Sequence, residues 1–154
     1  MAPTTINGIE ELQGVVGQTI GPSDWREVTQ EMIDAFADIS GDHQWIHVDV
    51  ERAEKESPFG GPIAHGNLTL STIDGFRDGL LAQEGFRLGV NYGWNKVRFP
   101  APVPVGARIR ASIEIASVDE VGEGWFQVVQ RWTVELEGGE KPVCVADSVT
   151  RVLA

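Results

Sequence analysis

The spacing of hydrophobic residues changes along the chain, from a helical period in the first half to a period of two in the second. Between Thr29 and Gly41 the apolar side chains fall on one helical stripe: Met32, Ile33, Phe36 and Ala37. Thr29 is a good N-cap because its hydroxyl can accept a first-turn N–H, and Gly41 tolerates the left-handed conformation that ends many helices. The pattern therefore predicts a helix over residues 29–40.

Two further helices are predicted before the period changes. A short one begins at Asp49 and ends at the Pro58 turn, and a longer one covers residues 66–83. The longer helix contains Gly75 and Gly79, each of which costs about 1 kcal/mol relative to alanine in an exposed helix. Because glycines four apart share one helical face, we expect a sheet to approach the helix closely on that side.

The second half of the chain alternates between apolar and polar residues, which is typical of half-buried strands. The clearest alternation covers residues 108–115. Further strands are predicted over residues 92–99, 126–134 and 143–153. Helices followed by a run of antiparallel strands indicate an α+β fold, and 154 residues without repeats or linkers fit one domain, 1–154.

Composition and charge restrict the possible partners. The net charge of −11 opposes binding to nucleic acid or to an anionic membrane, and no apolar run approaches the roughly 20 residues of a membrane span. A single cysteine, Cys144, and an N-terminus without a signal-peptide pattern predict a cytoplasmic protein. An anionic ligand such as coenzyme A would need local positive charge, and the densest basic stretch consists of Lys96, Arg98, Arg108 and Arg110.

The candidate chemistry lies between the first two predicted helices. Asp42 follows the helix terminator and His47 comes five residues later, so both side chains can turn toward one small volume and share a water molecule. Imidazole titrates near neutrality and can take a proton from water, while a carboxyl group can hold the same water. Helix capping or loop bracing would explain the two residues equally well without any catalysis.

A glycine-rich turn comes directly before the longest predicted helix. Residues 58–66 deliver free backbone N–H groups to a helix N-terminus, where the macrodipole favours negative charge. Gly66 has no side chain to keep a substrate carbonyl from its N–H. The turn can therefore stabilise the enolate charge that develops when an unsaturated thioester is hydrated, although a plain helix entry would look the same.

These segments resemble the signature of the MaoC-like (R)-specific hydratases, the hydratase 2 motif, in the branch that contains nodulation protein N. The matching residues are Phe36, Ser40-Gly41-Asp42, Ile46-His47 and Ile63-Ala64-His65-Gly66. The family usually has Asn-Pro where this chain has Gln44-Trp45, so the resemblance fixes the reaction type better than the substrate.

The resemblance implies a hot-dog fold, in which an antiparallel sheet wraps a long central helix. It implies (3R)-specific hydration of trans-2-enoyl-CoA, or of an acyl carrier protein thioester, by a homodimeric lyase of fatty acid metabolism without a metal or redox cofactor. Asp42 and His47 would activate the catalytic water, and the Gly66 N–H would bind the thioester oxygen.

Three alternatives remain open. A hot-dog thioesterase would use an acidic residue on the central helix, such as Asp74. A subunit that binds acyl thioesters without catalysis could keep the same motif. The third alternative is a metal site with the following ligands: Asp42, His43, His47 and Asp49.

The remaining histidines and two tryptophans have separate interpretations. His65 is expected to be a structural hydrogen bonder rather than the base. His43 is expected to face solvent or line the site entrance. Trp45 and Trp94 could shape an acyl pocket, but large aromatic side chains more often belong to the core.

Overall fold

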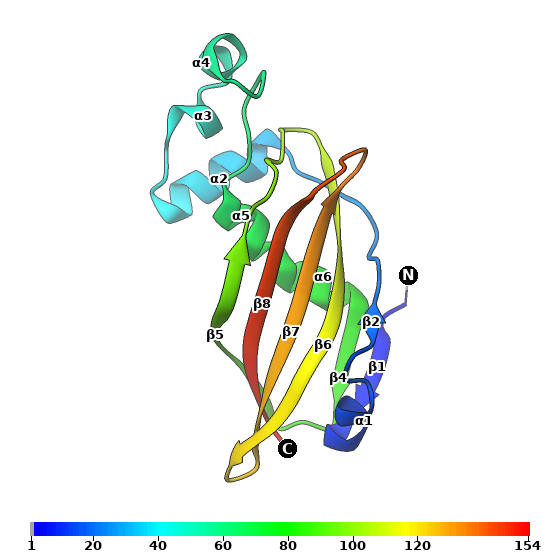
Figure 1. The fold of residues 1–154 in the computed structure, drawn as a ribbon. Helices are drawn as coiled ribbons and strands as arrows, with labels where there is room; N and C mark the ends of the chain where they lie inside the picture. Colours follow the sequence, from blue (N-terminus) through cyan, green and yellow to red (C-terminus); the bar gives the residue numbers. More distant parts are fainter. Residues whose placement is uncertain (1) are drawn as a thin grey trace.

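The computed structural model describes residues 2–154, which form a strongly curved six-stranded sheet, a separate two-stranded sheet, and helices on the concave side and at one end of the larger sheet (Figure 1). The helices are α1 (Gly8–Gly14), α2 (Gln30–Ser40), α3 (Trp45–Val48), α4 (Val50–Glu56), α5 (Gly66–Ser71) and α6 (Ile73–Leu80). The strands are β1 (Thr4–Asn7), β2 (Thr19–Ile20), β3 (Arg26–Glu27), β4 (Leu81–Glu84), β5 (Leu88–Arg98), β6 (Arg108–Gly122), β7 (Trp125–Leu136) and β8 (Pro142–Leu153).

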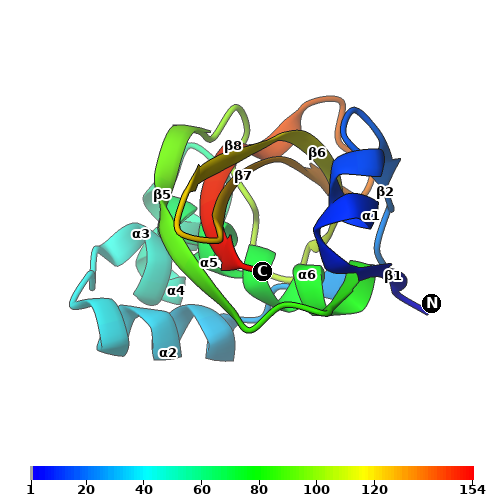
Figure 2. The ribbon, with the colours of Figure 1, turned by 90° about the horizontal axis from the view of Figure 1, so that it is seen from below.

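The main sheet has the strand order β2-β6-β7-β8-β5, and β3 also pairs with β6. Its strands are antiparallel, and it curls around α5 and α6, as Figure 2 shows along the axis of the curl. The predicted α+β hot-dog arrangement is confirmed. The strands are longer than the sequence pattern indicated, because β-bulges shift the register in β5 and β6 and interrupt the regular alternation.

The first two predicted helices are also confirmed. The Thr29 hydroxyl accepts the Met32 N–H at 3.2 Å, and Gly41 ends α2 with a φ of 81°. Asp49 caps α4 by accepting the Arg52 N–H at 3.1 Å.

The longest predicted helix is shorter and less regular than expected. The Thr72 N–H donates to both Leu68 O and Thr69 O, so the helix tightens between α5 and α6 but keeps its direction. The prediction that it continues to residue 83 is wrong, because residues 81–84 form β4 and pair in parallel with β1. The pairing partner lies at the other end of the chain, where local periodicity gives no sign of it.

The predicted role of Gly75 and Gly79 is wrong as well. Both glycines are exposed, whereas the buried side chains of α6 are Ile73, Phe76 and Leu80. A Cβ added at Gly79 would meet nothing within 4 Å. The sheet therefore contacts the opposite side of the helix.

The core lies between α5–α6 and the concave face of the sheet. The alternate residues of β6, from Ile109 to Ile115, are fully buried, and Trp132 of β7 is the largest side chain with no exposure. Trp45 and Trp94 lie outside this core. Within residues 2–154, no helix combines the length and the apolar character that crossing a membrane requires.

Candidate active site

Asp42 lies in the loop after α2, and His47 lies on α3. Asp42 follows the end of α2, where its N–H donates to Ser40 Oγ and its carboxylate accepts the Gln44 N–H at 3.3 Å. His47 lies on α3, a one-turn helix that the sequence pattern did not predict. Asp42 is exposed, whereas His47 is buried with 7% exposure, so the pair opens to solvent from the Asp42 side.

The tautomer of His47 is set by its contact with the segment before α5. His47 Nδ1 lies 2.7 Å from the carbonyl oxygen of Ile63. Since a carbonyl oxygen can only accept, Nδ1 carries the proton, and in the neutral ring Nε2 has the free lone pair. The imidazole is thus held in the form that can accept a proton from water.

The Ile63 carbonyl is fixed by contacts on both sides of its segment. The Ile63 N–H donates to Ile46 O at 3.1 Å, and the Ala64 N–H donates to Val103 O at 2.8 Å. Ile63 also forms an isolated β-bridge with Pro104. This orienting carbonyl was missed from the sequence, because a backbone contact between residues 16 apart leaves no pattern in side chains.

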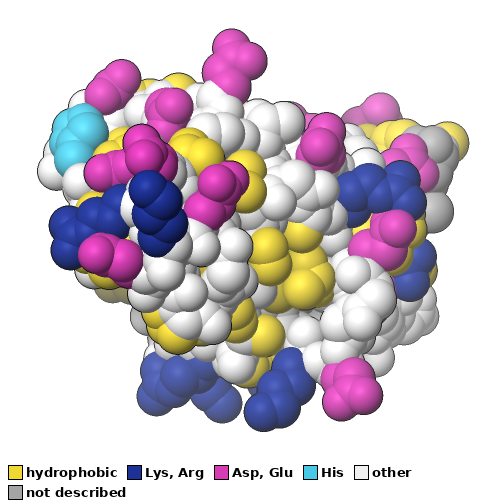
Figure 3. Space-filling view, turned by 90° about the horizontal axis from the view of Figure 1, so that it is seen from above, with side chains coloured by type: hydrophobic (Ala, Val, Ile, Leu, Met, Phe, Trp, Pro, Cys, Tyr) yellow, Lys and Arg dark blue, Asp and Glu magenta, His cyan; other side chains and the backbone are white. Residues whose placement is uncertain are grey.

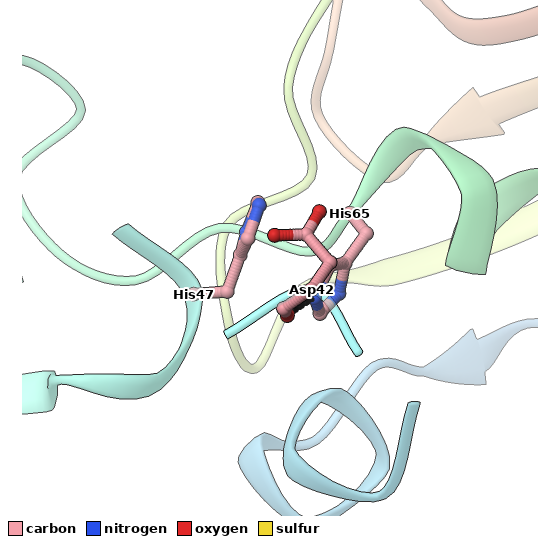
Figure 4. Close-up of side chains that lie close together, drawn as sticks. All are labelled: Asp42, His47 and His65. Carbon is pink, nitrogen blue, oxygen red and sulfur yellow. Dashed lines mark hydrogen bonds between the residues drawn. The ribbon is translucent and has the colours of Figure 1, made fainter. Parts of the chain in front are cut away.

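His65 completes the group that Figure 4 shows. Its Nε2 lies 3.0 Å from the backbone oxygen of Asp42, and its ring stacks on His47 with centroids 3.9 Å apart and planes at 26°. Its other ring nitrogen, Nδ1, is buried and has no hydrogen-bond partner among residues 2–154. His65 therefore braces Asp42 and His47 together, which agrees with its predicted structural role.

The same three residues form a possible ligand set for a metal ion. One carboxylate oxygen of Asp42 and one ring nitrogen each of His47 and His65 lie within 4.8 Å of one another. Ring lone pairs point outward in the ring plane, so two stacked imidazoles direct theirs side by side rather than toward one point. The arrangement therefore fits a metal ion poorly.

The metal set considered from the sequence is not assembled. His43 lies 2.9 Å from Asp38 on the protein surface, and this hydrogen bond raises the pKa of His43. The Asp49 carboxylate caps α4.

Gly66 begins α5 immediately after His65. The first-turn N–H groups of a helix have no partners within the helix, and no side chain caps this end of α5. Gly66 also lines an apolar cavity of about 280 Å³ between α5 and the chain segment after β5. The ring of Phe99 lies so close that a Cβ added at Gly66 would be 2.8 Å from Phe99 Cε2.

The cavity has one polar side chain, that of Thr69; its other lining residues are Phe59, Ile63, Ala64, Gly66, Phe99, Pro100, Ala101, Pro102, Val103 and Val143. Neither Trp45 nor Trp94 lines it. Arg52 covers the Trp45 ring at 4.2 Å, and Trp94 is 44% exposed at the edge of the sheet. The prediction that these two tryptophans belong to the core is therefore wrong. They also do not line this cavity, so the cavity gives no support to the interpretation that they shape an acyl pocket.

Comparisons with known proteins place the chain in a family. Residues 11–135 match the family model of the MaoC-like domain. The chain is 47% identical over 150 residues to 3-hydroxyacyl-thioester dehydratase Z of Mycobacterium tuberculosis strain H37Rv, covering 97% of this chain and 99% of the relative. It is 41% identical to nodulation protein N of Rhizobium leguminosarum bv. viciae, covering 88% of this chain and 84% of the relative. A solved Archaeoglobus monoamine oxidase regulatory protein superposes with a TM-score of 0.80 at 28% identity, covering 99% of this chain and 97% of the other.

Proposed function

The chain belongs to the MaoC-like dehydratase family, and from this premise we propose that it catalyses the reversible, (3R)-specific hydration of trans-2-enoyl-CoA. The observation that carries the proposal is the placement of the Asp42 carboxylate beside the His47 ring, next to a helix entry with free N–H groups at Gly66.

Each group has one task in the proposed reaction. Asp42 and His47 hold one water molecule between them, and His47 Nε2 takes a proton from it. The water oxygen bonds to C3 of the enoyl group, and the proton returns to C2 through the Asp42–His47 pair. Since both new bonds form on the side of the substrate that faces the pair, the addition is syn.

Gly66 supplies the electrostatic part of the mechanism. As the C3–O bond forms, negative charge moves to the thioester oxygen, and the Gly66 N–H at the start of α5 donates to that oxygen. The helix macrodipole favours the same charge. When water is eliminated in the reverse direction, the same enolate charge develops and the same donor stabilises it.

The thioesterase alternative finds no comparable site. The Asp74 carboxylate, on which it depended, is exposed and forms an ion pair with Arg77 Nη1 at 2.6 Å. Asp74 also lies about two helical turns beyond Gly66.

The test is hydration of crotonyl-CoA by the purified protein. Loss of the enoyl-thioester absorbance should accompany formation of (3R)-3-hydroxybutyryl-CoA, identified by chiral analysis. Asp42→Asn and His47→Gln should each lower kcat at least about 100-fold while the protein stays folded. Thiol release without hydration would favour a thioesterase, and absence of turnover at every acyl length would leave a non-catalytic binding subunit.

We also propose that the chain works as a homodimer joined through β5. This strand is a sheet edge of eleven residues, and its large apolar side chains are exposed: Leu88, Val90, Tyr92 and Trp94. An uncovered edge of this length is a ready template for a second strand, and an antiparallel β5 from a second copy would bury it.

Light scattering should give twice the chain mass, and Trp94→Arg should shift the protein toward the monomer. A wild-type mass of one chain at micromolar concentration would refute the proposal.

A further inference from the structure

A second cavity, of about 150 Å³, is lined by residues of α6, β4, β5, β7 and β8. It shares no lining residue with the cavity at Gly66. Arg77, its residue on α6, lies about three helical turns beyond Gly66. Gly89 and Asn91 of β5 line the second cavity and are exposed, so it opens to solvent along that edge strand. The second cavity is therefore separate from the candidate active site.

Polar groups dominate the lining of this second cavity. The polar side chains are those of Arg77, Gln83, Asn91, Gln130 and Thr150. By contrast, the Gly66 cavity has one polar side chain among its lining residues. In ligand sites, a few polar groups fix the orientation of the ligand and give specificity. A guanidinium group, three carboxamides and a hydroxyl group suit a small ligand with oxygen acceptors.

The Arg77 guanidinium group is largely buried but incompletely hydrogen bonded. The side chain is 18% exposed and lies 5.3 Å from the centre of the Trp132 ring. Its Nη1 donates to Asp74 at 2.6 Å, and its Nη2 donates to Gln130 Oε1 at the long distance of 3.4 Å. Its Nε is buried and has no hydrogen-bond partner among residues 2–154. Since an unsatisfied buried donor costs free energy, this group gains from a further acceptor.

The Asp74 carboxylate neutralises the Arg77 guanidinium group only in part. The Asp74 side chain is 67% exposed, so water screens its attraction for the guanidinium group. The second partner, Gln130, is uncharged and 1% exposed. Positive charge therefore remains available at the cavity.

The charge of the whole molecule favours a monoanion over a dianion at this cavity. Acidic side chains are spread over the face that Figure 3 shows, and the net charge is −11. The field of the molecule therefore opposes a dianion about twice as strongly as a monoanion. A single guanidinium group offers one positive charge against that field.

The size and the apolar walls of the cavity limit the ligand further. At roughly 30 Å³ per molecule in liquid water, a volume of about 150 Å³ corresponds to about five water molecules. Val90 and Val152 add apolar surface to the wall. A ligand of this size therefore needs an anionic oxygen pair at one end and a short alkyl group at the other.

We propose that this cavity binds a short-chain monocarboxylate, with Arg77 as its anchor. The planar donor fork of arginine matches the two oxygens of a carboxylate. Amide N–H groups and the Thr150 hydroxyl are donors for the remaining lone pairs, and the alkyl group packs against the two valines. The site is remote from the Asp42–His47 pair, and the inference does not depend on the reaction proposed for that pair.

The experiment is an NMR titration of the full isotope-labelled chain with three probes at constant ionic strength. The probes are propanoate, the uncharged propanamide of the same shape, and inorganic phosphate. Propanoate should shift the side-chain amide signals of Gln83, Asn91 and Gln130 with a Kd on the order of 1 mM, because so small a ligand buries little surface. Propanamide and phosphate should each bind at least about tenfold more weakly.

Two variants and a matched control assign the effect to the cavity. Arg77→Gln should weaken propanoate binding at least about tenfold. Thr150→Val keeps the shape of the side chain but removes the hydroxyl, and should weaken binding about threefold. Arg151→Gln is the control, because Arg151 follows Thr150 on β8 but projects from the opposite face, where its guanidinium group lies over the Tyr92 ring. This control should bind propanoate as tightly as wild type.

Four results would overturn the proposal. The first is the absence of a saturable shift up to about 100 mM propanoate. The second is equal binding of propanoate and propanamide, because the guanidinium charge would then have no part in it. The third is phosphate binding as tight as that of propanoate. The fourth is an unchanged Kd for propanoate in Arg77→Gln and Thr150→Val, and Thr150→Val alone decides this point if Arg77→Gln does not fold.

Discussion

Replacing Gly66 by alanine tests whether a thioester oxygen approaches the start of α5. The added Cβ would lie 2.8 Å from Phe99 Cε2, 2.9 Å from Cδ2 and 3.1 Å from Cζ. Carbon atoms in ordinary contact are about 3.5 Å apart or more, so the ring must move. Phe99 is 42% exposed and can swing outward into solvent.

The cost to folding should therefore be small. Overpacking costs roughly 1–3 kcal/mol in a closed core, and the half-exposed position of the Phe99 ring places this site at the low end. Alanine has the higher helix propensity, by at most about 1 kcal/mol, and less at the first position of a helix such as residue 66. The net change in the free energy of unfolding should stay within about 1 kcal/mol, which thermal denaturation would measure.

The cost to catalysis should be much larger. A methyl group at residue 66 occupies the space through which the thioester oxygen reaches the N–H, and losing one such donor typically lowers kcat about 100- to 1000-fold. The assay is hydration of crotonyl-CoA. Gly66→Ala combined with Phe99→Leu should relieve the ring contact without restoring kcat, which separates the blocked donor from the displaced ring.

Gly79→Ala is the matched control on the same pair of helices. Its Cβ would meet nothing within 4 Å, so the variant should keep full activity and gain up to about 1 kcal/mol of stability. If Gly66→Ala kept kcat within about threefold of wild type, the assignment of the Gly66 N–H to the thioester oxygen would be refuted.

Three further predictions concern groups around and beyond the site. His65→Ala should lower kcat at least about tenfold with little change in KM, because the Asp42 backbone loses the hydrogen bond that holds it in place. His65→Gln keeps an N–H donor and should recover part of the loss. Wild-type activity in both variants would contradict the bracing role. Burial raises the pKa of the Cys144 thiol to about 11, so iodoacetamide at pH 8 should alkylate it at least about 100-fold faster in urea than in the native protein, as mass spectrometry would show. The hydrogen bond that the His43 ring donates to the Asp38 carboxylate raises the pKa of His43. The stability that this contact adds is therefore full below the unfolded pKa and is lost as pH rises through the folded pKa. Asp38→Asn should lower the His43 pKa in an NMR titration, and an unchanged value would show that the pairing is absent in solution.

Local signals in the sequence were sufficient for the elements whose ends depend on their own residues. Thr29 and Gly41 set the limits of α2 because a cap and a left-handed stop act within one turn. The alternation of β6 indicated the buried face of the strand, since side chains on neighbouring residues must point to opposite sides. Asp42 and His47 could be predicted to meet because only four residues separate them.

Tertiary structure decided the features that depend on residues far apart in the chain. The central helix ends at Leu80 because the following segment pairs with β1, and the exposed side of that helix carries the glycines because the sheet packs on the other side. The Ile63 carbonyl orients His47, and the Phe99 ring covers Gly66.

The four basic residues of β5 and β6 give the clearest example of this division. They look alike in the sequence, but Arg108 and Arg110 meet carboxylates across and beyond the neighbouring strand β7, while Lys96 and Arg98 meet none within residues 2–154. Charge can be counted from composition, whereas its pairing depends on which strands become neighbours. The sequence therefore determined the types of chemical group that the chain carries, and the fold determined which of them are paired.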